Sequence, residues 1–392
     1  MTISRRRLLS LTAAAAAVGA LAACSAERGG TTTTAEETPG GTDTEPTAEE
    51  TGGGAEAGGL IGIAMPTKSL ERWNRDGAHL EGLLQGMGYE TSLQYADNKQ
   101  DQQNNQVQNM INDGAVVIVV ASIDGTAMGP VLQQAADAGV KVLAYDRLIN
   151  GTPNVDYYAT FDNYKVGQLQ GQYIVDHMED YRGEDGEINL EPFAGSPDDN
   201  NARFFFGGAW DIIGPMVADG TFTCPSGKAP ADSEGWASIG INAWQSSGAQ
   251  AEMENRLNSF YGDGQKVNVV LSPNDSLALG IQQALDGAGY APGEDWPLLT
   301  GQDADLANVQ AMLQGKQTMT VWKDTRMLGD QVSKMIDQMV KGEEVDVNDT
   351  DTYDNGEKVV PSFLIEPVVV TQDNVEEQLV ESEFYTAEDL GL

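Results

Sequence analysis

The sequence predicts an α/β protein with two doubly wound, parallel-sheet lobes. From residue 60 onward, short apolar runs alternate with longer amphipathic stretches, the order expected of repeated strand–helix–strand units. Several runs are continuous in Val and Ile, which indicates strands covered on both faces. About 330 residues follow this point, which exceeds one typical core and suits two lobes.

The first lobe begins with a strand at Leu60–Met65. Leu80, Leu83, Leu84 and Met87 follow at i, i+3, i+4 and i+7, which predicts one face of a helix that ends at a glycine. The same two patterns predict strands over 89–95, 115–121 and 140–145, and helices over 102–112 and 130–138.

A second series of elements begins with a strand at 157–161. Helices are predicted over 166–178, 249–260, 277–285, 306–313 and 327–339. Extended segments are predicted over 188–194, 267–271, 298–300, 318–322 and 363–370. The region 180–245 is rich in Gly, Asp and Asn, and its pattern favours no further element.

The N-terminus predicts export and a lipid anchor. Three arginines precede the apolar stretch Leu8–Ala20, and Leu21-Ala22-Ala23-Cys24 then resembles the lipobox of bacterial lipoproteins. Residues 1–24 are therefore expected to be a lipoprotein signal peptide with Cys24 as the lipidation site. An ordinary cleaved signal with an incidental Cys24 is the alternative, and both general and twin-arginine export stay open. Residues 25–59, mostly Thr, Glu, Gly, Ala and Pro, are expected to be a disordered tether.

The charge of the chain excludes some partners. The formal net charge is −38, and residues 1–24 hold three of the 22 basic residues and no acid, so the remaining chain carries −41. Such a charge repels nucleic acid and anionic headgroups and disfavours an anionic ligand. No nucleic acid is expected as a partner, and the membrane is expected only through the lipid anchor.

Cysteine and histidine are too few for a metal or catalytic centre. If Cys24 carries lipid, Cys224 has no disulfide partner, and His79 and His177 belong to unrelated helices. The acidic run Asp346–Asn355 lacks the glycine and distal glutamate of an EF-hand, and a solvated loop is expected there. No metal, cofactor or catalytic residue is predicted.

Polar side chains follow six of the predicted strands. Ligands bind at the carboxyl ends of strands in open parallel sheets, so these side chains are expected to share one site. They include Arg72 and Trp73, Asp146 and Arg147, Asp199 and Asn201, Asn274, Asp303, and Lys323.

This mixture of donors and acceptors suits a neutral polyol. Carboxylates accept, Arg and Lys donate, and Asn does both, whereas phosphate would favour basic groups and a metal would favour carboxylates alone. Trp73 and Trp244 are candidates to stack on a sugar ring. Single residues have plainer interpretations: a helix N-cap for Asp, core packing for Trp, and a surface ion pair for Asp-Arg. The pattern alone leaves a sugar and another small polar solute open.

The same residues carry a resemblance to a known family. The chain from about 60 to 387 resembles periplasmic sugar-binding proteins of the type I fold, in the xylose-binding and multiple-sugar-binding (ChvE-like) branch. The stretches that carry it are 62–68, 71–73, 119–125 (VVASIDG), 142–148 (VLAYDRL), 157–163 (YYATFDN), 195–202 (GSPDDNNA), 301–305 (GQDAD) and 359–362.

The resemblance implies a site, a fold and a role. The sugar would be bound by Arg72, Trp73, Asp146, Arg147, Asp199, Asn201, Trp244, Asn274, Asp303 and Lys323. Three hinge crossings, near 163, 324 and 366, would divide an N-terminal lobe (60–163 plus 324–366) from a C-terminal lobe (164–323 plus 367–392). The role implied is capture of a monosaccharide by a monomeric, non-enzymatic lipoprotein on the outer face of the cell membrane. An ABC permease and its ATPase would then receive the sugar.

Two other functions stay open. The loaded lobes could instead dock on a chemoreceptor or histidine-kinase ectodomain as a sensor. Asp146, Asp199 and Asp303 could supply a glycosidase pair, although the neighbouring Arg72, Arg147 and Lys323 are expected to hold these carboxylates ionised. A transcription repressor is excluded because a signal segment, and no basic helix-turn-helix, precedes the fold.

Overall fold

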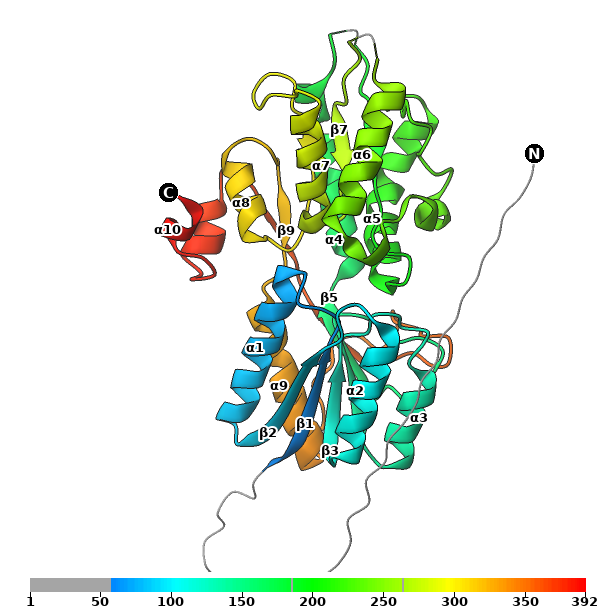
Figure 1. The fold of residues 1–392 in the computed structure, drawn as a ribbon, viewed down its shortest axis with the longest axis vertical. Coiled ribbons are helices and arrows are strands. Elements are labelled where there is room, and N and C mark those ends of the chain that lie inside the picture. Colours follow the sequence, from blue (N-terminus) through cyan, green and yellow to red (C-terminus); the bar gives the residue numbers. More distant parts are fainter. Residues whose placement is uncertain (1–57, 185, 263) are drawn as a thin grey trace, which may run out of the picture. The chain divides into compact units, whose positions relative to one another are not determined.

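The first of two lobes is built on a six-stranded sheet in which all neighbouring strands are parallel. The strand order is β10-β5-β4-β3-β1-β2, so the chain reverses its direction of travel across the sheet between β1 and β3 (Figure 1). The strands are β1 (Gly58–Met65), β2 (Tyr89–Tyr95), β3 (Ala115–Val120), β4 (Lys141–Tyr145), β5 (Tyr157–Phe161) and β10 (Ser362–Ile365).

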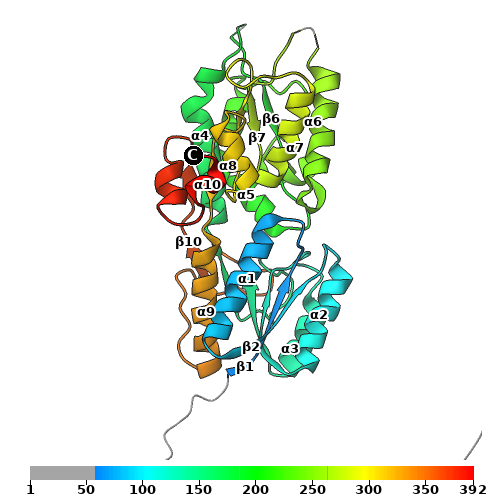
Figure 2. The ribbon, with the colours of Figure 1, turned by 60° about the vertical axis from the view of Figure 1, so that its left-hand side comes forward.

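Helices cover both faces of this sheet. Helices α1 (Glu71–Gly86) and α9 (Thr325–Lys341) lie on one face, and α2 (Gln100–Asn112) and α3 (Gly129–Asp137) on the other (Figures 1 and 2). Because successive strand residues point to opposite faces, Ile61 and Ile63 pack with α1 and α9, whereas Ala64 packs with α2 and α3. This two-sided burial explains the continuous apolar runs in the sequence.

The second lobe contains a parallel sheet of β6 (Leu190–Pro192), β7 (Val269–Leu271) and β8 (Leu298–Leu299). Strand β9 (Thr320–Trp322) joins it through a parallel bridge between Gln302 and Val321, and pairs antiparallel with β11 (Val368–Val370). Its α-helices are α4 (Asn163–His177), α5 (Asn200–Ala218), α6 (Ser246–Phe260), α7 (Asp275–Gly287), α8 (Leu306–Leu313) and α10 (Ala387–Leu390).

The computed structural model describes residues 58–392 except Asp185 and Asp263. The predicted signal peptide 1–24, with Cys24, and nearly all of the predicted tether 25–59 lie outside these residues. β1 begins at Gly58, two residues before the predicted start of the fold. None of the helices in the described part of the chain is long and apolar enough to cross a membrane.

The chain passes between the two lobes three times: between β5 and α4, between β9 and α9, and between β10 and β11. The last passage corrects the sequence analysis, which predicted one strand over 363–370. Instead, β10 ends at Ile365 and β11 begins at Val368 in a different sheet. Pro367 lies between them and has no N–H to donate to a strand partner. The exact lobe limits stay predictions.

Helix α5, which the sequence analysis did not assign, occupies much of the region 180–245. It spans 19 residues and contains Pro215. It packs closely on α4 because a glycine of each helix faces the backbone of the other: a Cβ on Gly167 would lie 2.0 Å from the carbonyl oxygen of Phe205, and one on Gly208 would lie 2.1 Å from that of Tyr164. This close approach fixes where the N-terminus of α5 points.

The acidic run Asp346–Asn355 is anchored at one end, which corrects the expectation of a fully solvated loop. Asn355 is buried, and its Nδ2 donates to the carbonyl oxygens of Ile149 and Thr152 at 3.1 and 2.9 Å. Tyr353 is also buried, and its ring packs edge-on against Tyr158. The aspartates at 351 and 354 are exposed.

Candidate functional site

One pocket between the lobes contains all ten residues proposed to bind sugar. About 310 Å³ of space free of protein atoms lies within it, part of it open to solvent. The lining residues come from both lobes: Leu70, Arg72, Trp73, Asp146 and Arg147 from the first, and Asp199, Asn201, Phe205, Trp244, Asn274, Gln302, Asp303 and Lys323 from the second or its boundary.

The pocket is formed where strands end and helices begin. Asp146 directly follows β4, and Lys323 directly follows β9. Asp199 and Asn274 are the N-caps of α5 and α7, and each side chain accepts a hydrogen bond from the first turn of its helix. These two residues therefore cap a helix and line the pocket at the same time. This is possible because a helix that follows a strand begins at the carboxyl end of that strand, which is the edge of the sheet where the pocket lies.

Arg72 joins three carboxylates across the pocket. Its Nη2 lies 3.0 Å from Asp76 Oδ2 and 2.9 Å from Asp146 Oδ1, and its Nη1 lies 3.3 Å from Asp303 Oδ1. Asp303 Oδ1 also lies 2.9 Å from Lys323 Nζ. The side chains are all buried, so these ion pairs are poorly screened by solvent.

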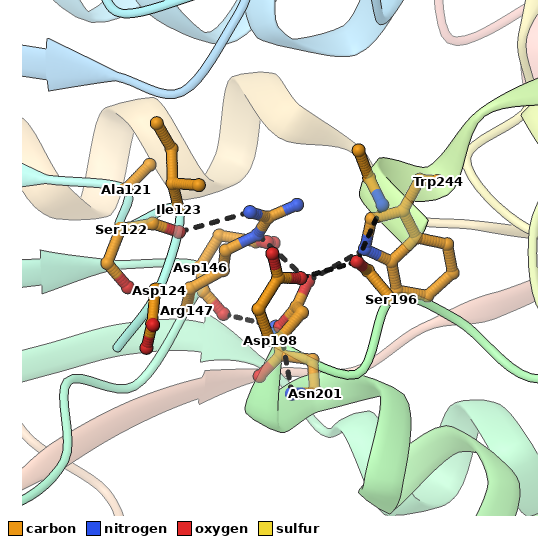
Figure 3. Close-up of polar contacts among 12 residues, drawn as sticks. Ala121, Ser122, Ile123, Asp124, Asp146, Arg147, Ser196, Asp198, Asn201 and Trp244 are labelled. Atoms are coloured by element: carbon orange, nitrogen blue, oxygen red, sulfur yellow. Dashed lines mark hydrogen bonds and ion pairs between the residues drawn. The ribbon is translucent and has the colours of Figure 1, made fainter. Parts of the chain in front are cut away.

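A second chain of contacts crosses between the lobes at Arg147 (Figure 3). Its Nη1 donates to the carbonyl oxygen of Ser122 at 3.0 Å, and its Nε lies 2.9 Å from Asp199 Oδ2. The indole Nε1 of Trp244 donates to the same Oδ2 at 3.1 Å. Arg147 therefore pairs with a carboxylate of the other lobe, and not with the adjacent Asp146.

Three pocket residues have backbone conformations in the left-handed region: Asp146 (φ 60°), Trp244 (φ 54°) and Asp303 (φ 95°). Such values are uncommon outside glycine and gather at functional sites. At Asp146 the surroundings hold this conformation, because its carbonyl oxygen accepts from Asn201 Nδ2 at 2.6 Å and from the Tyr158 hydroxyl at 2.8 Å.

The carboxylates differ in their pKa. Burial disfavours the charged form of Asp303, but Lys323 and Arg72 outweigh it and hold its pKa below the usual range. Burial raises the pKa of Asp199 by more than Arg147 lowers it. The neighbouring cations are expected from the sequence to hold these carboxylates ionised; at Asp199 burial of the side chain opposes this effect of Arg147.

The sequence analysis missed three lining residues and one supporting residue. Gln302 immediately precedes Asp303, so its position after β8 was a usable signal. Phe205 lies one turn after Asn201 on α5, and it was missed with that helix. Leu70 carries no polar signal. Asp76 was hidden within α1, where it lies one turn after Arg72 and pairs with it.

Several buried polar atoms of the residues that line the pocket have no hydrogen-bond partner among the described residues. They include Gln302 Oε1, Trp73 Nε1 and Arg72 Nε, all of them buried. Buried polar atoms are normally hydrogen-bonded, so unpaired ones beside a cavity indicate a polar guest. The residues that line the pocket include hydrogen-bond donors, acceptors and two indole side chains.

The described residues contain no cluster of three or more His, Cys, Asp or Glu that could hold a metal ion. Cys224 does not line the pocket. It lies 4.0 Å from Glu191 Oε2 and 3.5 Å from the Ser226 hydroxyl, and burial raises the pKa of its thiol. A thiol with a raised pKa is a poor nucleophile near neutral pH.

A family model described as a periplasmic binding protein domain matches residues 61–344. The chain belongs to this family. Its sheets and their crossings are those of the type I periplasmic binding fold. The sequence resemblance and the predicted fold class are thereby confirmed.

Three curated relatives align with more than four fifths of this chain. The multiple sugar-binding periplasmic receptor ChvE of Rhizobium radiobacter is 46% identical over 333 residues, which cover 85% of this chain and 92% of the relative. The D-xylose-binding periplasmic protein of Escherichia coli is 32% identical over 84% of this chain and 92% of its own length. The multiple sugar-binding periplasmic protein SbpA of Azospirillum brasilense is 47% identical over 83% of this chain and 89% of its own length.

Solved structures of the family superpose on the described fold. A solute-binding protein of an ABC transporter from Clostridium phytofermentans, with bound β-D-glucose, is 48% identical and has a TM-score of 0.79, covering 84% of this chain and 99% of its own. A carbohydrate-transporter binding protein from Chloroflexus aurantiacus, in complex with D-glucose, is 35% identical with a TM-score of 0.76, covering 84% and 98%.

Proposed function

We propose that this protein captures one monosaccharide, an aldopyranose such as glucose, galactose, xylose or arabinose, between its two lobes. The observation that carries the proposal is the pocket between the lobes, whose lining combines donors, acceptors and two indoles. The glucose-bound structures at 48% and 35% identity support it, because they share the fold over more than four fifths of this chain.

The contacts suggest how binding is coupled to closure. Arg72 and Asp146 lie in one lobe, and Asp199, Asp303 and Trp244 in the other, so a sugar touching both sets favours the closed arrangement. A ligand shifts such an equilibrium only by its differential affinity for the two states. Closure also excludes water, which strengthens the charge-assisted hydrogen bonds to the hydroxyl groups.

The role of the protein follows from its family and its N-terminus. We infer that it is exported, that Cys24 anchors it to the outer face of the cell membrane, and that residues 25–59 tether it there. The closed, monomeric protein would deliver its sugar to an ABC permease with its ATPase. Delivery to a sensor ectodomain is the alternative, and deletion of the permease would separate the two roles by abolishing uptake alone.

We infer binding without turnover. A glycosidase needs one carboxyl free to protonate the leaving oxygen. Asp199, whose raised pKa makes it the best candidate, already accepts from the backbone N–H of Asn201 at 2.9 Å and from the indole N–H of Trp244, and it forms an ion pair with Arg147. Its oxygens are thus occupied by donors. Release of a chromophore from aryl glycosides by the purified protein would contradict this inference.

Calorimetric titration of the full-length chain carrying Cys24→Ser with aldopyranoses tests the binding proposal. We expect at least one aldopyranose to bind, with Kd in the micromolar range or tighter. Absence of heat and of thermal stabilisation with every pentose and hexose tried would overturn the proposal.

A matched pair of variants tests whether sugar binds in this pocket. Lys323→Met removes the ammonium beside Asp303, and we expect it to weaken sugar binding about 10- to 100-fold, because a charge-assisted hydrogen bond is lost and a buried carboxylate loses a partner. Lys228→Met removes the same charge from the second lobe outside the pocket lining. Equal affinity losses in both variants would show that net charge, and not the pocket contact, governs binding.

A further inference from the structure

A second set of contacts joins the lobes outside the sugar pocket, and it is centred on Arg75 of α1. Arg75 Nη1 donates to the Tyr385 hydroxyl at 2.6 Å, and its Nη2 lies 3.6 Å from Asp305 Oδ1. The Tyr385 hydroxyl in turn donates to the carbonyl oxygen of Ala304 at 2.9 Å. Arg75 belongs to the first lobe, whereas Asp305 is the N-cap of α8 in the second lobe.

The ring of Phe384 contacts two arginines of the first lobe. The guanidinium carbons of Arg75 and of Arg326, on α9, are 4.9 and 5.2 Å from the centre of its ring. Arg326 Nη1 also donates to the carbonyl oxygen of Ser382 at 3.0 Å. A cation over an aromatic face is attracted to it, and two such contacts hold the ring from both helices.

The segment that carries Phe384 and Tyr385 is fixed to the second lobe. The Phe384 ring packs edge-on against Trp322 of β9, with 5.3 Å between ring centres. Leu379 and Leu390, on either side of it in the sequence, are buried in a cluster with residues of α8 and β9. Figure 2 shows the C-terminal helix α10 beside α8. The two arginines therefore contact the second lobe through this segment.

These contacts share two short pieces of chain with the sugar pocket. Arg72 faces the pocket and Arg75 follows it after one helical turn. Asp303 faces the pocket, and Asp305 is reached through Ala304, whose φ of 49° turns the chain sharply. Two arginine–aspartate pairs thus join the lobes, Arg72–Asp303 at the pocket and Arg75–Asp305 beside it.

We infer that Arg75 and the segment Ser382–Tyr385 form an interlobe latch that stabilises the closed state without touching the sugar. The latch must separate when the lobes open, because its partners lie on opposite sides of the crossings. It therefore adds to the closing free energy that the sugar supplies, and it slows sugar release. The part that concerns sugar rests on the function proposed above.

Interlobe distance and sugar release test the latch. The full-length chain would carry Cys24→Ser and Cys224→Ser, with spin labels at Asn109→Cys on α2 and Asn255→Cys on α6, both exposed helix positions. Pulsed electron resonance gives the distance distribution, and stopped-flow tryptophan fluorescence gives the release rate. Arg75→Ala is compared with Tyr385→Phe, which removes only the hydroxyl.

Arg182→Ala is the matched control, because it removes an equally charged arginine whose ion pair with Glu179 lies within the second lobe. We expect Arg75→Ala to shift the sugar-free distribution toward longer distances, to speed sugar release about tenfold, and to leave association nearly unchanged. Tyr385→Phe should act in the same direction with a smaller effect.

Two results would overturn the latch. In the first, Arg75→Ala changes neither the rate of sugar release nor the interlobe distance distribution. In the second, Arg182→Ala changes both quantities as much as Arg75→Ala does. If no aldose binds the unsubstituted protein, the proposed function fails by itself. The sugar-free distances then decide the latch alone, and an unchanged distribution refutes it.

Discussion

Replacing Arg72 by leucine should destabilise the folded protein severely, even without sugar. The guanidinium lies 2.9 to 3.3 Å from oxygens of Asp76, Asp146 and Asp303. Each contact corresponds to about 5 kcal/mol of gross attraction at an effective dielectric constant of about 20, and desolvation opposes most of it. Removing one partner of a buried ion pair typically costs about 3–5 kcal/mol, because the other charge stays buried and unpaired. We expect a loss in this range for Arg72→Leu.

The neighbouring carboxylate makes the prediction sharper. Asp76 is fully buried, and burial already raises its pKa despite Arg72. Asp76→Asn leaves Arg72 two carboxylates, so we expect it to cost only about 1–2 kcal/mol. In the double variant no unpaired Asp76 remains. The double variant should therefore be at least about 2 kcal/mol more stable than the sum of the single losses predicts.

Urea unfolding followed by tryptophan fluorescence measures these free energies. The loss caused by Arg72→Leu should be larger at pH 8 than at pH 5. Without Arg72 the folded-state pKa of Asp76 rises further, so the folded state binds the proton more tightly than the unfolded state, and stability falls as pH rises between the two pKa values. Additive single losses, within about 0.5 kcal/mol, would refute this reasoning.

Two further predictions follow from the described contacts. Gly195→Ala should lower the free energy of unfolding by about 1–3 kcal/mol and shift the tryptophan emission, because the added Cβ would lie 2.0 Å from the Trp244 ring. Asp305→Asn should reduce the pH dependence of stability: burial, and then the charge of Asp303, raise the pKa of Asp305 to about 7. The folded state therefore binds an extra proton between about pH 4 and 7, and stability should fall over this range more in the unsubstituted protein than in the variant.

Each of these predictions has a control on an outer helix. Gly207→Ala on α5 places its Cβ 3.8 Å from the nearest atom, a normal contact, so no loss is expected. Asp137→Asn on α3 removes an exposed carboxylate and should leave the pH dependence of the urea midpoint unchanged. Unaltered tryptophan emission in Gly195→Ala would show that the Trp244 side chain moves aside without cost. If Asp305→Asn keeps the full pH dependence of stability, that pH dependence arises from other groups.

The sequence predicts structure well where a local residue pattern is produced by only one kind of structure. Buried parallel strands must be apolar on both sides, so β1, β3 and β4 could be located from Val, Ile and Leu alone. The ends of those strands then predicted the pocket, since topology brings the carboxyl ends of parallel strands together. The candidate residues other than Trp244, which lies in the short turn before α6, come together for this reason, while their roles in binding stay predictions.

Other features depend on contacts that no local pattern reports. Helix α5 begins at an asparagine pair and contains glycine and proline, and it is held by the packing of Gly167 and Gly208 against facing backbone. Pro367 marks the break between β10 and β11. Which sheet each half joins is decided by distant partners: β10 pairs with β5, roughly 200 residues earlier, and β11 pairs with β9, roughly 50 residues earlier. The pKa of Asp199 depends on complete enclosure, which a list of neighbouring charges cannot express.

The position of β10 has a consequence for the nascent chain. This strand lies at the edge of the first sheet, beside β5, yet it is made only after almost the whole second lobe. A growing chain that has not reached residue 362 therefore presents β5 as an unprotected edge, open to pairing with another molecule. Completion of the earlier lobe waits for the later one, so truncation near the C-terminus should promote aggregation of a part of the protein that lies far upstream.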